Sequence, residues 1–141
     1  MNNYPPVILT DSSILIAYYS SKDNYHNAVC RFFEQCTSEL ITTTACVTEI
    51  MYLLSADYRT QNEFLNDLAQ QLYQCIPLLP HDFNRIKQLN QQYSDLPGDF
   101  ADLSLIAISE RLNISAILTL DSDFDIYRRY RKQPFQRIFL T

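Results

Sequence analysis

Two aspartates follow short apolar runs at points where a strand would end. Asp11 comes after the run Val7 to Thr10, and Asp121 comes after the run Ala116 to Leu120. Runs this short and this rich in branched residues are typical of buried strands in a parallel sheet. The carboxyl ends of parallel strands share one edge, where open α/β sheets bind ligands, so both carboxylates would lie there. Either aspartate taken alone could equally be an ordinary turn or cap residue.

Glu49 lies inside an apolar helical segment. Its neighbours three and four positions away are apolar or aromatic: Ala45, Cys46, Tyr52 and Leu53. An unpaired buried carboxylate costs on the order of several kcal/mol. No lysine or arginine lies between Arg31 and Arg59, so a bound metal ion would satisfy this charge. A basic partner from elsewhere in the fold, or a helix turned so that Glu49 faces water, is the alternative.

Asp102 begins another apolar helix and shares a face with Ile106, four residues on. The first helical turn favours a carboxylate through the helix dipole. Asp99 is placed to be the N-cap of this helix, which puts Asp102 at the capping-box position, usually held by Glu or Gln. We interpret Asp99 as the cap and Asp102 as a metal ligand.

Four carboxylates, Asp11, Glu49, Asp102 and Asp121, would thus reach one sheet edge from four separate elements. Oxygen ligands without His or Cys suit a hard ion, Mg²⁺ or Mn²⁺. One such ion, or two roughly 3.5–4 Å apart, supports in-line hydrolysis of a phosphodiester. Crowded carboxylates repel one another, so we expect the metal to stabilise the fold.

Alternating strands and helices must position these acids. The pattern predicts an α/β protein, a three-layer α/β/α sandwich with a mainly parallel sheet, as one domain over residues 1–141. The expected strands are 7–10, 40–42, 75–79, 116–120 and, at an edge, 135–140. The expected helices are 14–19, one capped by Asn24, one from Thr43 or Thr44 to about Leu54, 60–73, 81–93 and 99–112.

Basic residues gather at the end of the chain. The net charge is −5, yet five of the eleven lysines and arginines fall in the last fourteen positions, which hold no acid. This asymmetry favours an acidic site beside a basic grip on nucleic acid. We expect Arg128, Arg129, Arg131 and Lys132 to hold an RNA backbone, while Tyr127 and Tyr130 could stack on bases. A solvated basic hairpin is the alternative.

Composition excludes several other classes. Gly98 is the only glycine, which rules out a Gly-rich phosphate loop and a dinucleotide fingerprint. The four cysteines form no C-x-x-C pair, and no metal-ligand spacing links them to a histidine. No secretory signal or membrane-spanning run is evident. We therefore expect reduced thiols, a cytoplasmic location and no membrane partner.

The arrangement of these acids resembles the PIN-domain family, and within it the VapC-type toxin ribonucleases of bacterial VapBC toxin–antitoxin pairs. The resemblance covers nearly the whole chain and rests on four motifs in order: Leu9-Thr10-Asp11-Ser12-Ser13, Thr48-Glu49-Ile50, Asp95 to Ser104 with Asp102 as the third acid, and the T-x-D-x-D-F segment Leu118 to Phe124. Gly98-Asp99 departs from the pattern, where a more apolar pair is expected, and this leaves Asp99 as either a fifth acid of the site or simply a cap.

The resemblance implies an α/β/α sandwich, Mg²⁺ or Mn²⁺, and cleavage of single-stranded or structured RNA. It also implies a cognate antitoxin protein and a homodimer. It matches Asp123 to a position that is often acidic, which offers a further metal ligand, and it gives Ser12 and Thr119 the role of orienting the acids through their hydroxyls.

Three rival functions stay open. A haloacid dehalogenase type phosphatase needs D-x-D at the first strand, where this chain has Asp11-Ser12-Ser13. A phospho-receiver domain wants a paired acid motif near the start and a late lysine, and neither is evident. A degenerate PIN-like domain that binds RNA or a protein without catalysis is the third.

Overall fold

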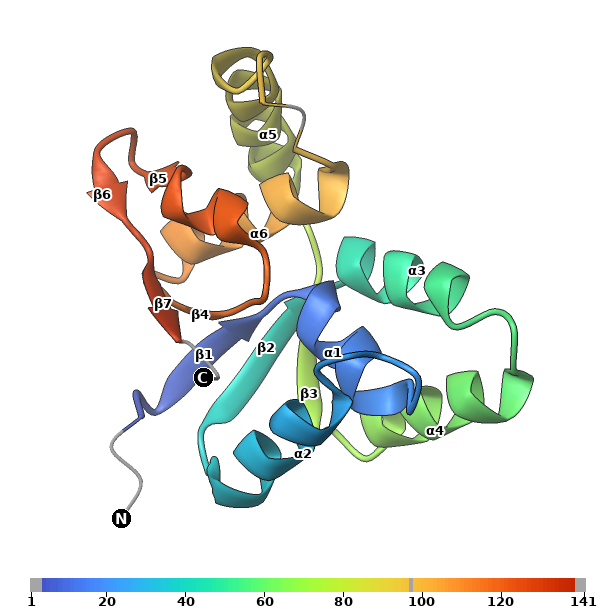
Figure 1. The fold of residues 1–141 in the computed structure, drawn as a ribbon. Helices are drawn as coiled ribbons and strands as arrows, with labels where there is room; N and C mark the ends of the chain where they lie inside the picture. The colour runs from blue at the N-terminus through green and yellow to red at the C-terminus, as the bar shows by residue number, and fades with distance from the viewer. Residues whose placement is uncertain (1–3, 97, 139–141) are drawn as a thin grey trace.

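A computed structural model describes residues 4–96 and 98–138, and a central sheet lies between two layers of helices (Figure 1). The sheet has the strand order β3-β2-β1-β4-β7, and every pairing in it is parallel. Its strands are β1 (Val7–Thr10), β2 (Glu39–Thr43), β3 (Tyr73–Ile76), β4 (Ala116–Leu118) and β7 (Gln136–Ile138). The predicted α/β/α sandwich is confirmed.

Six α-helices and one 3₁₀ helix connect these strands within the described residues. They are α1 (Ser12–Tyr19), α2 (His26–Gln35), α3 (Thr44–Leu53), α4 (Tyr58–Ala69), α5 (Pro80–Gln92), α6 (Phe100–Arg111) and the 3₁₀ helix η1 (Ser122–Asp125). A small antiparallel hairpin, β5 (Arg128–Arg129) with β6 (Gln133–Pro134), precedes the edge strand β7. We call residues 128–134 the basic hairpin.

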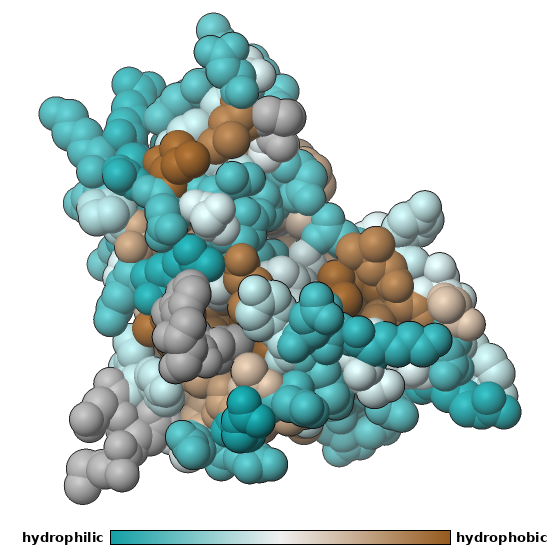
Figure 2. All heavy atoms as spheres, in the orientation of Figure 1, coloured by the Kyte–Doolittle hydropathy of each residue, from teal (hydrophilic) through white to brown (hydrophobic). Residues whose placement is uncertain are grey.

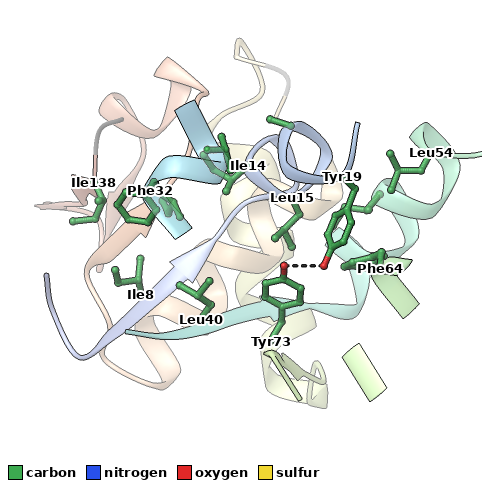
Figure 3. Close-up of a cluster of buried hydrophobic side chains, with 14 of the residues drawn as sticks. Ile8, Ile14, Leu15, Tyr19, Phe32, Leu40, Leu54, Phe64, Tyr73 and Ile138 are labelled. Carbon is green, nitrogen blue, oxygen red and sulfur yellow. Dashed lines mark hydrogen bonds between the residues drawn. The ribbon is translucent and has the colours of Figure 1, made fainter. Parts of the chain in front are cut away.

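Alternate residues of each central strand feed two separate cores. Ile8 and Leu40 belong to the core under α1, α2 and α4, which Figure 3 shows in close-up. Leu9 and Ile41 belong to the opposite core, under α5 and α6. Because helices cover both faces, the central strands β1 and β4 carry apolar side chains on both sides, as the sequence pattern of the first strand indicates. Helix α3 contributes to both cores, with Ile50 in the first and Cys46 in the second.

The chain reverses its direction of travel across the sheet between β1 and β4. From β1 it moves outward to β2 and β3, and it then returns to add β4 and β7 on the other side of β1. The ladder continues past the strand ends, because the Asp11 N–H donates to the Leu118 carbonyl at 3.1 Å. A reversal of this kind opens a crevice outside the carboxyl ends of the two neighbouring strands, where α/β proteins bind ligands.

Several element boundaries differ from the sequence expectation. The strand expected at 75–79 lies at Tyr73–Ile76, because Tyr73 is buried beside Tyr19 and Pro77 has no N–H to continue the ladder. Helix α4 begins after its cap Asp57 and ends at Ala69 rather than at residue 73. Asn24 does not cap α2. The helix begins at His26 with Tyr25 as N-cap, after a turn in which Asp23 accepts the Tyr25 N–H.

Other boundaries are close to the expectation. Strand β4 ends at Leu118, two residues before the predicted end, and β7 is an edge strand as predicted. Residues 139 and 140 of the predicted last strand lie outside the described residues.

The surface is mostly polar on the face drawn in Figure 2, with hydrophobic side chains gathered in separate patches, one of them over α3. Within residues 4–96 and 98–138, no helix combines the length and the apolar character needed to cross a bilayer.

Candidate metal centre

Three carboxylates from distant parts of the chain meet outside the carboxyl ends of β1 and β4. Asp11 follows β1, Asp121 lies three residues beyond β4, and Asp102 lies in the first turn of α6. Each offers an oxygen, and the three oxygens lie within 4.8 Å of one another. Oxygen ligands at roughly 2.0–2.6 Å from a hard cation can surround one ion at this spacing.

Asp11 is held in place by three hydroxyl groups. Thr119 Oγ1 donates to its Oδ2 at 2.6 Å, Ser13 Oγ donates to the same atom at 3.1 Å, and Ser12 Oγ lies 3.2 Å from Oδ1. Thr119 Oγ1 also accepts the Asp121 N–H at 2.9 Å, so one side chain joins both strand ends. Burial raises the pKa of Asp11, and these hydrogen bonds oppose that rise.

Asp121 is the N-cap of η1, where its Oδ1 accepts the Asp123 N–H at 2.9 Å. Asp123 is half-buried and lies outside the group of three converging carboxylates. Its pKa is raised, first by partial burial and then by the charge of Asp121. Asp123, two residues after Asp121, therefore lies beside the centre rather than within it.

Glu49 lies at the margin of the centre and is joined to Asp11 through one hydroxyl. Ser12 Oγ is in close contact with Glu49 Oε1 as well as with Asp11 Oδ1, and its single proton serves one of them at a time. Glu49 is half-buried, and it is not one of the three carboxylates that meet. Its pKa is raised to about 7, first by burial and then by Asp99 and Asp11.

Asp99 acts as the predicted N-cap of α6, since its Oδ1 accepts the Asp102 N–H at 2.8 Å. This bond fixes the backbone of the residue that contributes the third carboxylate. Asp99 is exposed, whereas Asp102 is 7% exposed. Burial is the largest cause that raises the pKa of Asp102 to about 8, and the neighbouring acids, Asp11 and Asp99 first, add to the rise.

No lysine or arginine of the described residues pairs with these acids. The salt bridges found there join Asp82 to Arg111, Glu110 to Arg85 and Asp125 to Arg137, with His81 also beside Asp82, and all lie outside the centre. An ionised Asp102 would therefore be a buried charge that the described residues leave uncompensated, and this costs free energy unless a cation binds. An all-carboxylate donor set fits Mg²⁺ or Mn²⁺ better than Zn²⁺ or copper.

Tyr127 is a residue of this centre that the sequence did not identify. It is fully buried, and its phenol donates to Asp102 Oδ2 at 3.3 Å. Burial raises its pKa, and the charge of Asp102 adds to that effect. The expectation that Tyr127 stacks on bases is wrong, because its ring is packed between Tyr93 and Phe124. Its spacing of three residues from Phe124 was the available signal for an inward position.

Some basic side chains of the hairpin are buried and others are exposed to solvent. Arg129 was expected to contact RNA, but it is only 3% exposed, and its Nη2 donates to the Ser109 carbonyl and to Asn113 Oδ1. The expectation for Arg129 is therefore wrong, because its guanidinium is buried against the end of α6. Arg131 and Lys132 are exposed at the tip.

Arg128 and Tyr130 hold the hairpin against the rest of the molecule. Arg128 is half-buried, and its Nη1 donates to the carbonyls of residues 125, 126 and 127. The phenol of Tyr130 donates to the Glu110 carbonyl, and its N–H donates to Glu110 Oε2 at 2.7 Å. Tyr130 and Arg131 both have positive φ, so the turn is tight and aims the tip outward.

The fold and the site together define an α/β/α protein with a carboxylate centre at the switch point of its sheet. Residues 8–130 match the sequence model of the PIN domain. A curated relative, Ribonuclease VapC26 of Mycobacterium tuberculosis, is 23% identical over 116 residues, which cover 81% of this chain and 86% of that protein. With the match to the PIN domain extending over most of its length, the chain belongs to the PIN domain family.

Solved structures share the same fold. VapC20 of Mycobacterium tuberculosis, a Sarcin-Ricin loop cleaving toxin, has a TM-score of 0.80 at 16% identity, covering 90% of this chain and 99% of that chain. A toxin–antitoxin complex from Klebsiella pneumoniae contains a chain with a TM-score of 0.62 at 16% identity, covering 82% of this chain and 87% of that one. Both are similar to this chain in fold.

Proposed function

We propose that this protein is an endoribonuclease that depends on Mg²⁺ or Mn²⁺, and that it is the toxin of a toxin–antitoxin pair. The observation that carries the proposal is the meeting of Asp11, Asp102 and Asp121 without a lysine or arginine partner among the described residues. Membership of the PIN domain family supports it, as do relatives named as a ribonuclease and as a Sarcin-Ricin loop cleaving toxin.

Asp11, Asp102 and Asp121 would hold the ion, with Glu49 and Asp123 beside it. When bound, a divalent ion stabilises charge on phosphate oxygens and lowers the pKa of water. The hydroxyls of Ser12 and Thr119 keep Asp11 in one orientation while the charge of the site changes. Asp102 or Asp121 accepts a proton from the attacking water, and the products carry a 5′-phosphate and a 3′-hydroxyl.

The tip of the basic hairpin is the RNA-binding surface in this proposal. Arg131 and Lys132 are exposed, and the hairpin follows η1, whose N-cap is Asp121. Arg128 has its guanidinium bound to backbone carbonyls and supports the hairpin rather than the RNA. Phosphate contacts from two cations give sequence-independent affinity that falls as salt rises.

An antitoxin protein and a second copy of the chain complete the proposal. Large side chains stand exposed near the centre, with Tyr52 at 76%, Phe83 at 51% and Phe100 at 48%. They line a groove of about 860 Å³ that also borders Glu49 and Asp99. Exposed apolar surface beside a functional site is typical of protein interfaces. The four free cysteines favour a cytoplasmic location.

The test is cleavage of RNA by the purified chain with Mg²⁺ or Mn²⁺, compared with EDTA. We expect Asp11→Asn and Asp121→Asn to abolish cleavage while the circular dichroism spectrum stays native, because each variant keeps the size of its side chain. Asp57→Asn is the matched control, since Asp57 caps α4 away from the centre and asparagine is an equally good cap.

Unchanged activity in both centre variants, or cleavage that persists in EDTA, would overturn the proposal. RNA binding without cleavage in any metal would instead favour a degenerate domain that only binds.

A further inference from the structure

The phenol of Tyr127 is held in one position by the side chains around it. The side chain is fully buried, and its ring meets Tyr93 and Phe124 edge-on, with centroids 5.0 and 5.1 Å away. The Tyr93 hydroxyl is itself held, because it accepts the Arg128 N–H at 2.8 Å. The ring is therefore clamped between two aromatic side chains, and its hydroxyl is directed at Asp102 Oδ2.

Gly98 provides the space for this hydroxyl. A Cβ at position 98 would lie 2.3 Å from the Tyr127 hydroxyl and 3.2 Å from its Cζ. Gly98 does not have a positive φ, so conformational freedom does not explain a glycine here. The only glycine of the sequence thus stands where any side chain would displace the group that contacts Asp102.

The Asp102 carboxylate has few hydrogen-bond partners. The backbone N–H of Asp102 donates to Asp99, whereas the carboxylate accepts from the Tyr127 phenol, its side-chain donor among the described residues. Oδ2 is engaged in this way, while no donor from those residues reaches Oδ1. A hydrogen bond to one oxygen limits rotation of the carboxylate and decides which oxygen is left for an ion. Donors of this kind tune metal sites in other proteins.

We propose that Tyr127 is a positioning residue, which orients the Asp102 carboxylate toward the cation, and that Gly98 exists to admit its hydroxyl. The inference rests on the proposed function, because it assumes that Asp102 is a metal ligand.

The experiment is isothermal titration calorimetry of the full chain with Mg²⁺ and with Mn²⁺. We expect Tyr127→Phe to weaken binding roughly tenfold, the lower end of the losses seen when an outer-shell partner is removed. The half-saturating metal concentration for RNA cleavage should rise by the same factor. The matched control is Tyr73→Phe, which removes another buried hydroxyl, bound to Tyr19 in the opposite core, and should leave metal binding unchanged.

A second pair of variants tests the role of Gly98. Gly98→Ala alone should weaken metal binding about as much as Tyr127→Phe, because the new methyl group displaces the hydroxyl. In the double variant the hydroxyl is absent, and the nearest Tyr127 atom left is 3.2 Å away. The double variant should therefore bind metal as Tyr127→Phe does, without a further loss.

The possible results of these titrations separate the inference from the proposed function. Metal binding by Tyr127→Phe equal to that of the wild type overturns the inference and leaves the proposed function standing. If the losses of metal affinity in the two single variants multiply in the double variant, the role assigned to Gly98 is overturned. A wild-type chain that binds neither ion overturns the proposed function and the inference together.

Discussion

Asp102 makes the metal-free protein less stable as the pH rises. Its pKa is about 8 in the folded protein, against an ordinary value of 3.8. Between these values the folded chain holds a proton that the unfolded chain has released, so the free energy of unfolding falls with increasing pH. By pH 7 the interval is about 3 pH units, and at about 1.4 kcal/mol for each the loss is about 4 kcal/mol. That is a large part of the roughly 5–15 kcal/mol that stabilises a protein domain.

Asp102→Asn should remove this loss. The amide has no proton to release in this range, and its oxygen can still accept from Tyr127. Its buried NH₂ group lacks a partner in return, which costs about 1–3 kcal/mol. We therefore expect the variant to be more stable than the metal-free wild type by about 1–3 kcal/mol at pH 7. The gain should disappear near about pH 5, because the loss in the wild type has shrunk there to about 2 kcal/mol, which the cost of the unpaired amide offsets.

The assay is urea unfolding in EDTA at several pH values, with the midpoint and slope compared between variant and wild type. Asp82→Asn is the contrasting control, because Asp82 is equally buried but pairs with Arg111 and accepts the Leu79 N–H. It should destabilise the protein at the same pH. The reasoning is refuted if Asp102→Asn is less stable than the wild type at pH 7 and above, or if the difference does not depend on pH.

Two further predictions concern RNA and metal. Replacing Arg131 and Lys132 together with alanine should weaken binding to RNA of any sequence. In a filter-binding series, the slope of log K against log salt should become smaller by about 2. The contrasting variant Arg129→Ala should instead lower the melting temperature, because the Arg129 guanidinium is buried. Affinity for Mg²⁺ should rise between pH 6 and pH 8, because Asp102 and Glu49, with pKa values of about 8 and about 7, must lose protons first. Calorimetry in two buffers of different ionisation heat should detect the released protons, and an affinity independent of pH would contradict this explanation.

The sequence predicted the strand ends at the centre because the relevant signals are local. A run of branched residues followed by Asp11 or Asp121 indicates a buried strand and its carboxyl end without knowledge of the partners. The parallel arrangement then brings the two ends together, since parallel strands share one edge. The cap at Asp99 is equally local, since the acceptor and the donor are three residues apart.

Contacts between distant segments could not be predicted in this way. Arg129 stands in a basic cluster, and its burial depends on Ser109 and Asn113, which lie on and just after α6. The inward position of Tyr127 depends on the space that Gly98 leaves across the core. The sequence alone showed a basic run with tyrosines and an unexpected glycine, and only packing separates the residues that face solvent from those that do not.

The same property of the centre determines both its instability and its expected affinity. Asp11 is restrained by hydroxyls that carry no charge, and Asp102 is restrained by a phenol and an N-cap, so the fold orients these acids without neutralising them. A lysine at this place would stabilise the metal-free chain, but it would occupy the position of the cation. Once Asp102 is ionised, the cost of its buried charge and of the neighbouring acids is relieved only by a cation that binds the folded state, so the bound metal and the fold stabilise one another. Asp102→Asn should therefore gain stability in EDTA and lose the stabilisation by Mg²⁺ in the same molecule.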